Sequence, residues 1–268
     1  MGGRLRFPIG SSIVSALVLS TSVLSGAEEA PAPPTPTAAP DQEVQPEQQA
    51  ELWAGHQLFL GSRTVPILGE LETRSEIYVL AQVEQSGGEI RLQQRLCKME
   101  VARFAGIRVS FLPEGVPKMP STRIVFQKKG ADRFEAIPWT TSWTTEDVDG
   151  DGKPGATVLV EAPICGGTVL VGSTSRSIAR GSTAGGGFEG ELRVSVAQRI
   201  LETSKGCISL AAHDSENRML GTFRYVPVAA DATCESLQAA GWPAQATSPK
   251  EVDRQEEQRR PRPKPLRR

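Results

Sequence analysis

The chain has 268 residues, a formal net charge of −1 and only 5% aromatic residues. This length suits one sizeable domain or two small ones. The near-zero net charge gives no electrostatic support for nucleic-acid binding, so we expect no nucleic-acid partner. The chain has two histidines, His56 and His213, which restricts histidine-based metal sites and catalysis.

The first 27 residues have the pattern of a cleavable signal peptide. Arg4 and Arg6 precede a short apolar run, and Ser25–Ala27 supplies small residues before Glu28. The run is too short and serine-rich for a good membrane span, and no cysteine follows it for lipid attachment. We expect residues 1–27 to be removed, leaving a soluble, periplasmic or extracellular protein without a stable membrane anchor. An uncleaved anchor is the alternative.

The two flanks of the chain are predicted to be disordered. Residues 28–51 form a Pro/Ala-rich linker that cannot bury a core. Residues 246–268 form a basic Pro/Arg tail, whose last ten residues carry six positive charges and no negative one. This tail either contacts anionic surface polymers or is only a soluble extension.

Between the flanks, residues 52–245 are predicted to form a β-rich domain. Runs of β-branched and alternating apolar residues are separated by Gly, Asp and Ser turns. About ten strands of this kind predict an all-β fold, either an antiparallel β-barrel or a β-sandwich. Cys234–Ala240 is the one segment that indicates a short helix. The predicted strands include 77–83, 90–96, 107–111, 123–126, 139–143, 156–160, 168–171, 192–200, 208–212 and 219–226.

Two of these strands resemble each other. Residues 90–96 and 194–200 each place a glutamine, Gln94 or Gln198, on an otherwise apolar face, with an arginine next in the chain. The match either marks a duplicated β unit or follows by chance from the shared alternation.

The four cysteines, Cys97, Cys165, Cys207 and Cys234, form an even set that suits disulfides in an exported protein. Three pairings are possible. The pairing of Cys207 with Cys234 would staple the last hairpin to the end of the domain, and would leave Cys97 with Cys165. Each bond would contribute about 3–4 kcal/mol in the loop-entropy model.

The strongest chemical motif is the acidic run from Asp147 to Lys153. Asp147, Asp149 and Asp151 occupy every second position, and Gly152 permits a sharp turn. Alternate carboxylates of this kind converge on one hard cation, with the backbone carbonyl of Lys153 as a fourth oxygen. We therefore predict a structural calcium site. A plain Asp/Gly turn without metal is the alternative.

Over about nine residues this run resembles the calcium loops of EF-hands, dockerins and related secreted bacterial repeats. The resemblance implies Asp147, Asp149, Asp151 and the Lys153 carbonyl as calcium ligands. Val158 stands where those loops place a bidentate glutamate, and strands rather than helices flank the run. A missing ligand would come from Glu146, Glu161 or water, and the affinity should fall toward about 0.1–1 mM.

Tryptophans near the acidic run and at the start of the domain give two weaker indications, one of a binding face and one of the type of fold. Trp139 and Trp143 flank the acidic run, either as a binding face for a flat ligand or as core residues. Trp53–Gly55 resembles, in three residues and in reversed order, a motif near the start of lipocalin-like barrels. This resemblance implies a closed barrel.

Two functions remain open from the sequence. The first is an exported, non-catalytic binding or structural module with a calcium-stiffened loop, which holds a small ligand or contacts a cell-surface partner. The second is a secreted hydrolase of cell-wall or polysaccharide substrates that uses paired carboxylates about 5–9 Å apart. We favour the first, because no convergent catalytic set is visible in the sequence.

Overall fold

The computed structural model describes residues 50–65, 69–103, 106–209 and 212–249. The predicted signal peptide, nearly all of the predicted linker and most of the basic tail lie outside these residues and remain predictions. The first described strand, β1, begins at Glu51.

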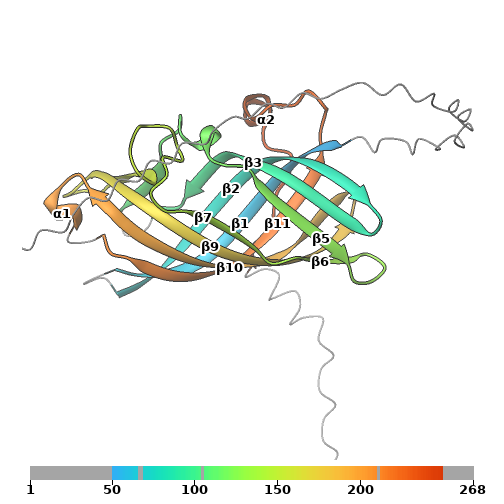
Figure 1. The fold of residues 1–268 in the computed structure, drawn as a ribbon, viewed down its shortest axis with the longest axis horizontal. Helices are drawn as coiled ribbons and strands as arrows, with labels where there is room; N and C mark the ends of the chain where they lie inside the picture. The colour runs from blue at the N-terminus through green and yellow to red at the C-terminus, as the bar shows by residue number, and fades with distance from the viewer. Residues whose placement is uncertain (1–49, 66–68, 104–105, 210–211, 250–268) are drawn as a thin grey trace, which may run out of the picture. The chain divides into compact units, whose positions relative to one another are not determined.

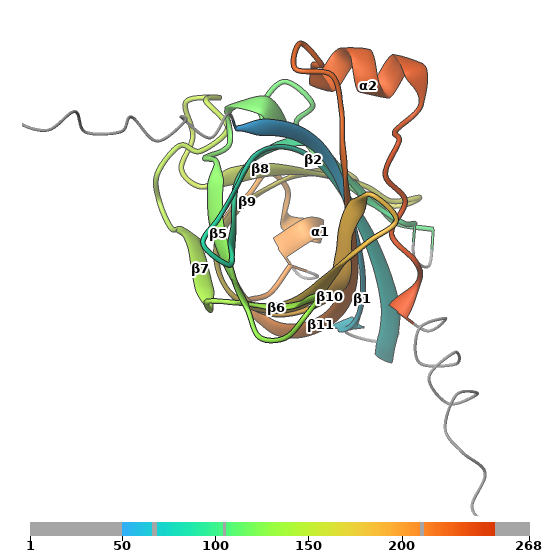
Figure 2. The same ribbon diagram turned by 90° about the vertical axis from the view of Figure 1, so that its right-hand side faces the viewer.

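The described residues form eleven strands in one antiparallel sheet that closes into a barrel (Figures 1 and 2). The predicted all-β fold is confirmed, and of its two forms the barrel is correct. The strands are β1 (Glu51–Val65), β2 (Gly69–Ser86), β3 (Glu89–Val101), β4 (Arg108–Phe111), β5 (Thr122–Lys128), β6 (Arg133–Ala136), β7 (Trp139–Trp143), β8 (Ala156–Glu161), β9 (Gly167–Ala184), β10 (Gly187–Thr203) and β11 (Ser215–Pro227).

Strand β9 closes the ring. One edge of β9 pairs with β10 along nearly its whole length. Its other edge pairs in succession with β8, β7 and β6, at residues 167–171, 173–177 and 180–182. Through β6, the ring continues to β5, β3, β2, β1, β11 and back to β10. Closure leaves the central strands without free edges, which are otherwise templates for aggregation.

Alternation along the strands places apolar residues inside and charged residues outside. On β10, Leu192 and Val194 are buried, whereas Arg193 and Ser195 are exposed. On β3 the alternation of inward and outward side chains shifts by one residue, because Tyr78 pairs with Lys98 and Val79 pairs with Leu96. Cys97 is the extra residue of this β-bulge, which directs its sulfur to the outer face.

The two ends of the barrel are packed differently. At one end, the aromatic rings of Phe126, Phe134, Phe188, Phe223 and Tyr225 form a continuous cluster with centroid separations of 4.8–5.8 Å. At the other end, a second cluster of smaller residues includes Val148, Ala156, Val158, Val169, Val171 and Ile208. The aromatic cluster therefore fills one half of the barrel interior.

All four cysteines form disulfides, but the pairing differs from the one we described from the sequence. Cys97 is bonded to Cys234, and Cys165 is bonded to Cys207. Cys207 lies in the short helix α1 (Gly206–Ser209), beside the β8–β9 loop that carries Cys165, so it cannot reach Cys234. The two disulfides indicate an oxidising environment.

Helix α1 also corrects a predicted strand. Residues 208–212 were expected to be extended, but Ile208 lies in α1, where the Ser209 and Ala212 amides bond to the carbonyls of Lys205 and Ile208. The following strand, β11, begins at Ser215, earlier than expected. Figure 2, which looks along the barrel, shows α1 within the outline of the ring of strands. Among the described residues, no helix has the length and apolar character needed to span a bilayer.

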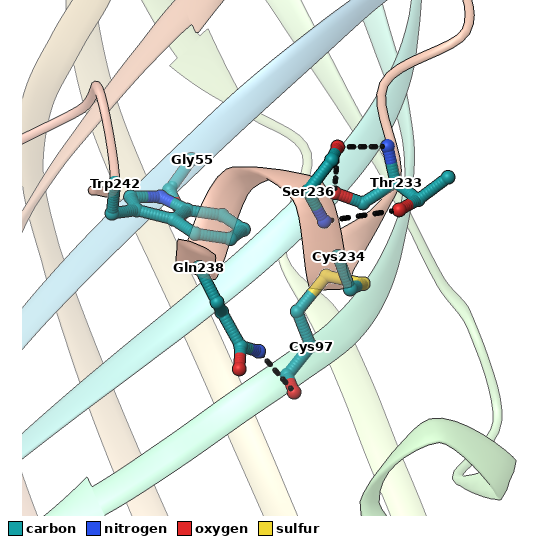
Figure 3. Close-up of a disulfide and its surroundings, with 7 residues drawn as sticks. All are labelled: Gly55, Cys97, Thr233, Cys234, Ser236, Gln238 and Trp242. Atoms are coloured by element: carbon teal, nitrogen blue, oxygen red, sulfur yellow. Dashed lines mark hydrogen bonds between the residues drawn. A yellow bond between two sulfur atoms is a disulfide. The ribbon is translucent and has the colours of Figure 1, made fainter. Parts of the chain in front are cut away.

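Helix α2 (Cys234–Ala240) packs on the outside of the barrel, as Figure 3 shows. Thr233 and Ser236 form a capping box at its start. Besides the disulfide to Cys97, the Gln238 side chain donates to the Cys97 carbonyl and the Trp242 indole donates to the Gly55 carbonyl, at 3.3 and 3.1 Å. The helix thereby covers an apolar patch that includes Ala54 and Leu80 on the outer face.

Residue His56 is buried on the same outer face, beneath the segment that follows α2. Its Nδ1 accepts a hydrogen bond from the Ala246 amide at 2.9 Å, and its Nε2 lies 3.2 Å from a Glu76 carboxylate oxygen. Burial lowers the pKa of His56, against the opposing attraction of Glu76. The ring is therefore held neutral, since a protonated Nδ1 could not accept the Ala246 hydrogen bond.

We predict that the protein loses stability as the pH falls below about 6.5, the usual histidine pKa. The unfolded chain binds a proton that the folded state excludes, so the His56 contribution is complete above this pH and shrinks below it. The expected loss in the free energy of unfolding is about 1 kcal/mol, comparable to one hydrogen bond. Chemical denaturation at a series of pH values measures it.

The variant His56→Asn keeps a hydrogen-bond acceptor without a titrating group, so it should flatten this pH dependence. The exposed His213 provides a matched control, because His213→Asn should leave the dependence intact. An unchanged slope in His56→Asn contradicts the role given to His56.

Candidate functional site

The hollow half of the barrel contains a cavity of about 760 Å³. Its walls come from the inward faces of the strands, from α1, and from the residues that follow the 3-10 helix η1 (Val116–Lys118). The volume lies within the range of about 300–1,000 Å³ that is usual for small-molecule sites. Apolar residues such as Val79, Leu96, Val171, Val194 and Met219 form most of the lining.

Both tryptophans that flank the acidic run line this cavity. Trp139 and Trp143 lie on β7 with their side chains half-buried. They are therefore cavity residues rather than an exposed aromatic face. The Trp143 indole nitrogen is buried and has no hydrogen-bond partner among the described residues.

A hydrogen-bonded triangle lies between the cavity and the aromatic cluster. The Gln57 Nε2 donates to the Tyr225 hydroxyl at 2.8 Å and to the Gln94 Oε1 at 3.2 Å. The Tyr225 hydroxyl donates to the same Gln94 oxygen at 2.6 Å. Tyr225 is fully buried, and burial raises the pKa of its hydroxyl, so it stays protonated as a donor.

The triangle links three strands that are distant in sequence, β1, β3 and β11. The sequence marks Gln94 and Gln198 as polar residues on apolar faces, and both line the cavity. Gln57 and Tyr225 were not identified from the sequence. The signal that could have found Gln57 is its position between Leu58 and the buried His56, where alternation makes it an inward residue.

The acidic loop lies between β7 and β8 and is ordered by its own carboxylates. Asp147 accepts hydrogen bonds from the amides of Gly150, Asp151 and Gly152, at 2.7–3.2 Å. Asp151 accepts from the Thr157 hydroxyl at 2.6 Å and from the Lys153 amide at 2.9 Å. At Gly155 the φ angle is 76°, and a Cβ atom there would lie 2.4 Å from the Val171 carbonyl oxygen, so glycine is required.

The structure brings the three predicted carboxylates together. One oxygen from each of Asp147, Asp149 and Asp151 lies within 4.8 Å of the others, in an arrangement that could hold a metal ion. Asp149 is only 1% exposed. Its Oδ2 accepts from the buried Thr157 amide at 2.7 Å, whereas its Oδ1 is buried without a partner among the described residues.

The electrostatics of the three carboxylates differ. The Gly152 amide and its neighbours lower the pKa of Asp147, and the Thr157 hydroxyl lowers that of Asp151. Burial, with the nearby charges of Asp151 and Asp147, raises the pKa of Asp149. An orphaned, buried carboxylate oxygen beside two further carboxylates is what a bound cation would compensate.

Lysine side chains lie close to the loop. The Lys153 ammonium lies 3.5 Å from an Asp151 oxygen, and the Lys118 ammonium donates to the Gly150 carbonyl at 3.2 Å. The predicted role of the Lys153 carbonyl as a cation ligand stays a prediction. At Gly115 a Cβ atom would lie 2.5 Å from the Asp149 Cβ, so the segment around η1 packs closely on the acidic loop.

The acidic loop and the cavity are connected through this segment. Met119 and Pro120, which follow η1, are part of the cavity wall. The loop therefore supports one side of the cavity.

No family model, curated protein or solved structure matches this chain. The proposal of a function therefore rests on the geometry of the cavity and the acidic loop.

Proposed function

We propose that the protein is an exported, non-catalytic binding module that holds an apolar small molecule inside its barrel. The observation that carries this proposal is the cavity of about 760 Å³, lined mainly by apolar side chains. The interior of a small closed barrel is just wide enough to be filled by side chains, as the aromatic cluster does at the other end, or to hold one small ligand. Although Trp139 and Trp143 line the cavity end, most inward residues there are smaller and leave the space between them open.

The lining also favours binding over the hydrolase alternative. Glycoside hydrolysis generally requires two carboxyl groups about 5–9 Å apart around the scissile bond. Among the described residues that line the cavity, Asp214 contributes the one carboxylate, and it accepts a hydrogen bond from the Ile200 amide at 2.8 Å.

Within this function, a calcium ion held by Asp147, Asp149 and Asp151 would stiffen the acidic loop and, through η1, one side of the cavity. Calcium prefers six to eight oxygen ligands in flexible geometry. The support for this assignment is the convergence of three carboxylates and the unpaired oxygen of Asp149.

The cavity is tested by titration with N-phenylnaphthylamine, an uncharged apolar dye whose fluorescence rises in an apolar environment. We expect saturable binding to the wild-type protein. Val196→Trp, which places a large ring in the cavity, should weaken dye binding at least about tenfold, because it fills the space that the ligand needs.

The matched control is Ala197→Trp, since Ala197 is exposed on the opposite face of β10 and should leave dye binding unchanged. An equal loss of dye affinity in both variants, or no loss in Val196→Trp, is evidence against binding in the barrel. Thermal melts of each variant establish that it is folded.

The cation is tested by thermal unfolding in a chelator and in excess calcium. Calcium at about ten times a dissociation constant of 0.1–1 mM should stabilise the fold by about 1.4 kcal/mol. In a domain of this size this corresponds to about 3–6 °C in the melting temperature. Magnesium should give a much smaller shift, because it demands a smaller octahedral site.

The variant Asp149→Asn removes a buried charge, so it should raise the melting temperature in chelator and abolish the shift with calcium. The exposed Asp231 gives the control, with Asp231→Asn expected to behave as wild type. A wild-type melting temperature that is the same with and without calcium refutes the cation site while leaving the cavity untouched.

A further inference from the structure

Building on the proposed function, we propose that the cavity selects uncharged ligands: an apolar skeleton that carries a neutral polar group, such as a hydroxyl or an amide. Charged amphiphiles of the same size, including ionised fatty acids, are excluded. The chemistry of the lining side chains carries this inference, together with the hydrogen-bonding capacity at the inner end of the cavity.

In the described part of the cavity lining, Asp214 supplies the one charged group. Among its described residues none is lysine, arginine or glutamate. The two ionisable side chains present, His213 and Asp214, are neighbours in the chain and both are exposed. A carboxylate or ammonium group carried into the apolar part would lose its hydration without gaining an opposite charge, which is strongly unfavourable.

Apart from the exposed His213 and Asp214, the polar side chains that line the described part of the cavity are neutral. Alternation along β9 turns Ser173, Ser175 and Ser177 inward as a row of hydroxyls. Two of them, Ser173 and Ser177, are buried, and the Ser175 hydroxyl donates to the Thr141 carbonyl. These groups tolerate a neutral polar ligand without creating a field that favours either sign of charge.

The Gln57–Gln94–Tyr225 triangle provides a matched pair of hydrogen-bonding groups. Its three bonds use the Gln57 Nε2, the Gln94 Oε1 and the Tyr225 hydroxyl. They do not engage the Gln57 carbonyl oxygen or the Gln94 amide nitrogen. One acceptor and one donor therefore remain at the inner end of the cavity, which suits a hydroxyl or an amide, since each can donate and accept.

The triangle also fixes the orientation of the Gln94 side-chain amide. Because the buried Tyr225 hydroxyl donates to Gln94, the Gln94 oxygen is turned toward Tyr225 and its amide nitrogen away from it. Below the triangle the aromatic cluster closes the barrel. A ligand that enters from the α1 end thus meets its polar partners at the deepest point.

The inference is tested by displacing N-phenylnaphthylamine with three ten-carbon chains that differ in the head group: decanol, decanoate and decyltrimethylammonium. At about pH 8, where the carboxyl group is ionised, we expect decanol to compete at least about tenfold more strongly than either ion. Decanoate or the ammonium compound competing as well as decanol would overturn the inference, although the proposed function would stand. If the dye does not bind and decanol gives no heat in calorimetry, the proposed function itself is contradicted.

The inner polar pair is tested by Gln94→Leu, with Gln82→Leu on the outer face of β2 as control. Gln94→Leu should weaken decanol about fivefold or more while the dye still binds, and the control should change neither. Unchanged decanol affinity in a folded Gln94→Leu protein overturns the role of the triangle. The comparison of the three head groups needs no variant, so the charge selectivity is testable even if Gln94→Leu does not fold.

Discussion

The pairing of β9 with four partners is the constraint on which the rest of the barrel depends. Its 18 residues are long enough to hold β10 on one edge and β8, β7 and β6 in sequence on the other. Because β7 and β8 attach to the same edge, both ends of the acidic loop that joins them are fixed beside β9, near Gly172. Because β9 turns its serines inward, it also supplies the polar row of the cavity. One strand thus determines the closure, the loop and part of the lining.

The division of the interior into a filled half and a hollow half follows from residue size. At one end, phenylalanines from β5 and β6 meet Phe188 of β10 edge to face, and Phe223 of β11 packs against Phe188 at a tilt. At the other end, Trp139 and Trp143 line the cavity, but most inward positions hold valines, serines and other smaller residues, and space is left between them. The Gln57–Gln94–Tyr225 triangle lies where one half gives way to the other. Its three hydrogen bonds form within the protein, so the triangle itself does not depend on a ligand.

Features set by local sequence were predictable. The alternation of β10 and the helix at Cys234–Ala240 depend on neighbouring residues, and the structure has them. The three aspartates of the acidic loop converge as their spacing predicts, because spacing in a short loop fixes which side chains face inward. The order of strands around the ring could not be predicted, since strands of similar composition are interchangeable in pairing.

Features that depend on contacts between distant parts of the chain could not be predicted from the sequence. The disulfide pairing depends on where α1 and α2 pack against the barrel. The residues next to Cys207 and Cys234 do not determine that placement. Ile208 begins a run with the composition of a strand, yet the bond between Cys165 and Cys207 holds Cys207 at this end of the barrel, and Ile208 and Ser209 lie in the helix α1. The cavity itself is a property of all the strands together. The sequence showed only its separate polar residues, such as Gln94 and Gln198.

The pairing of β1 with β11 has a consequence for the order in which the barrel assembles. Residues 53–61 of β1 bond to residues 219–227 of β11, near opposite ends of the domain. During synthesis from the N-terminus, the β1–β2–β3 meander can form early but keeps the outer edge of β1 open until β11 is complete. Contacts of such high sequence separation slow folding. The Cys97–Cys234 bond, which fastens α2 over this same region, can form only after that last strand has been delivered.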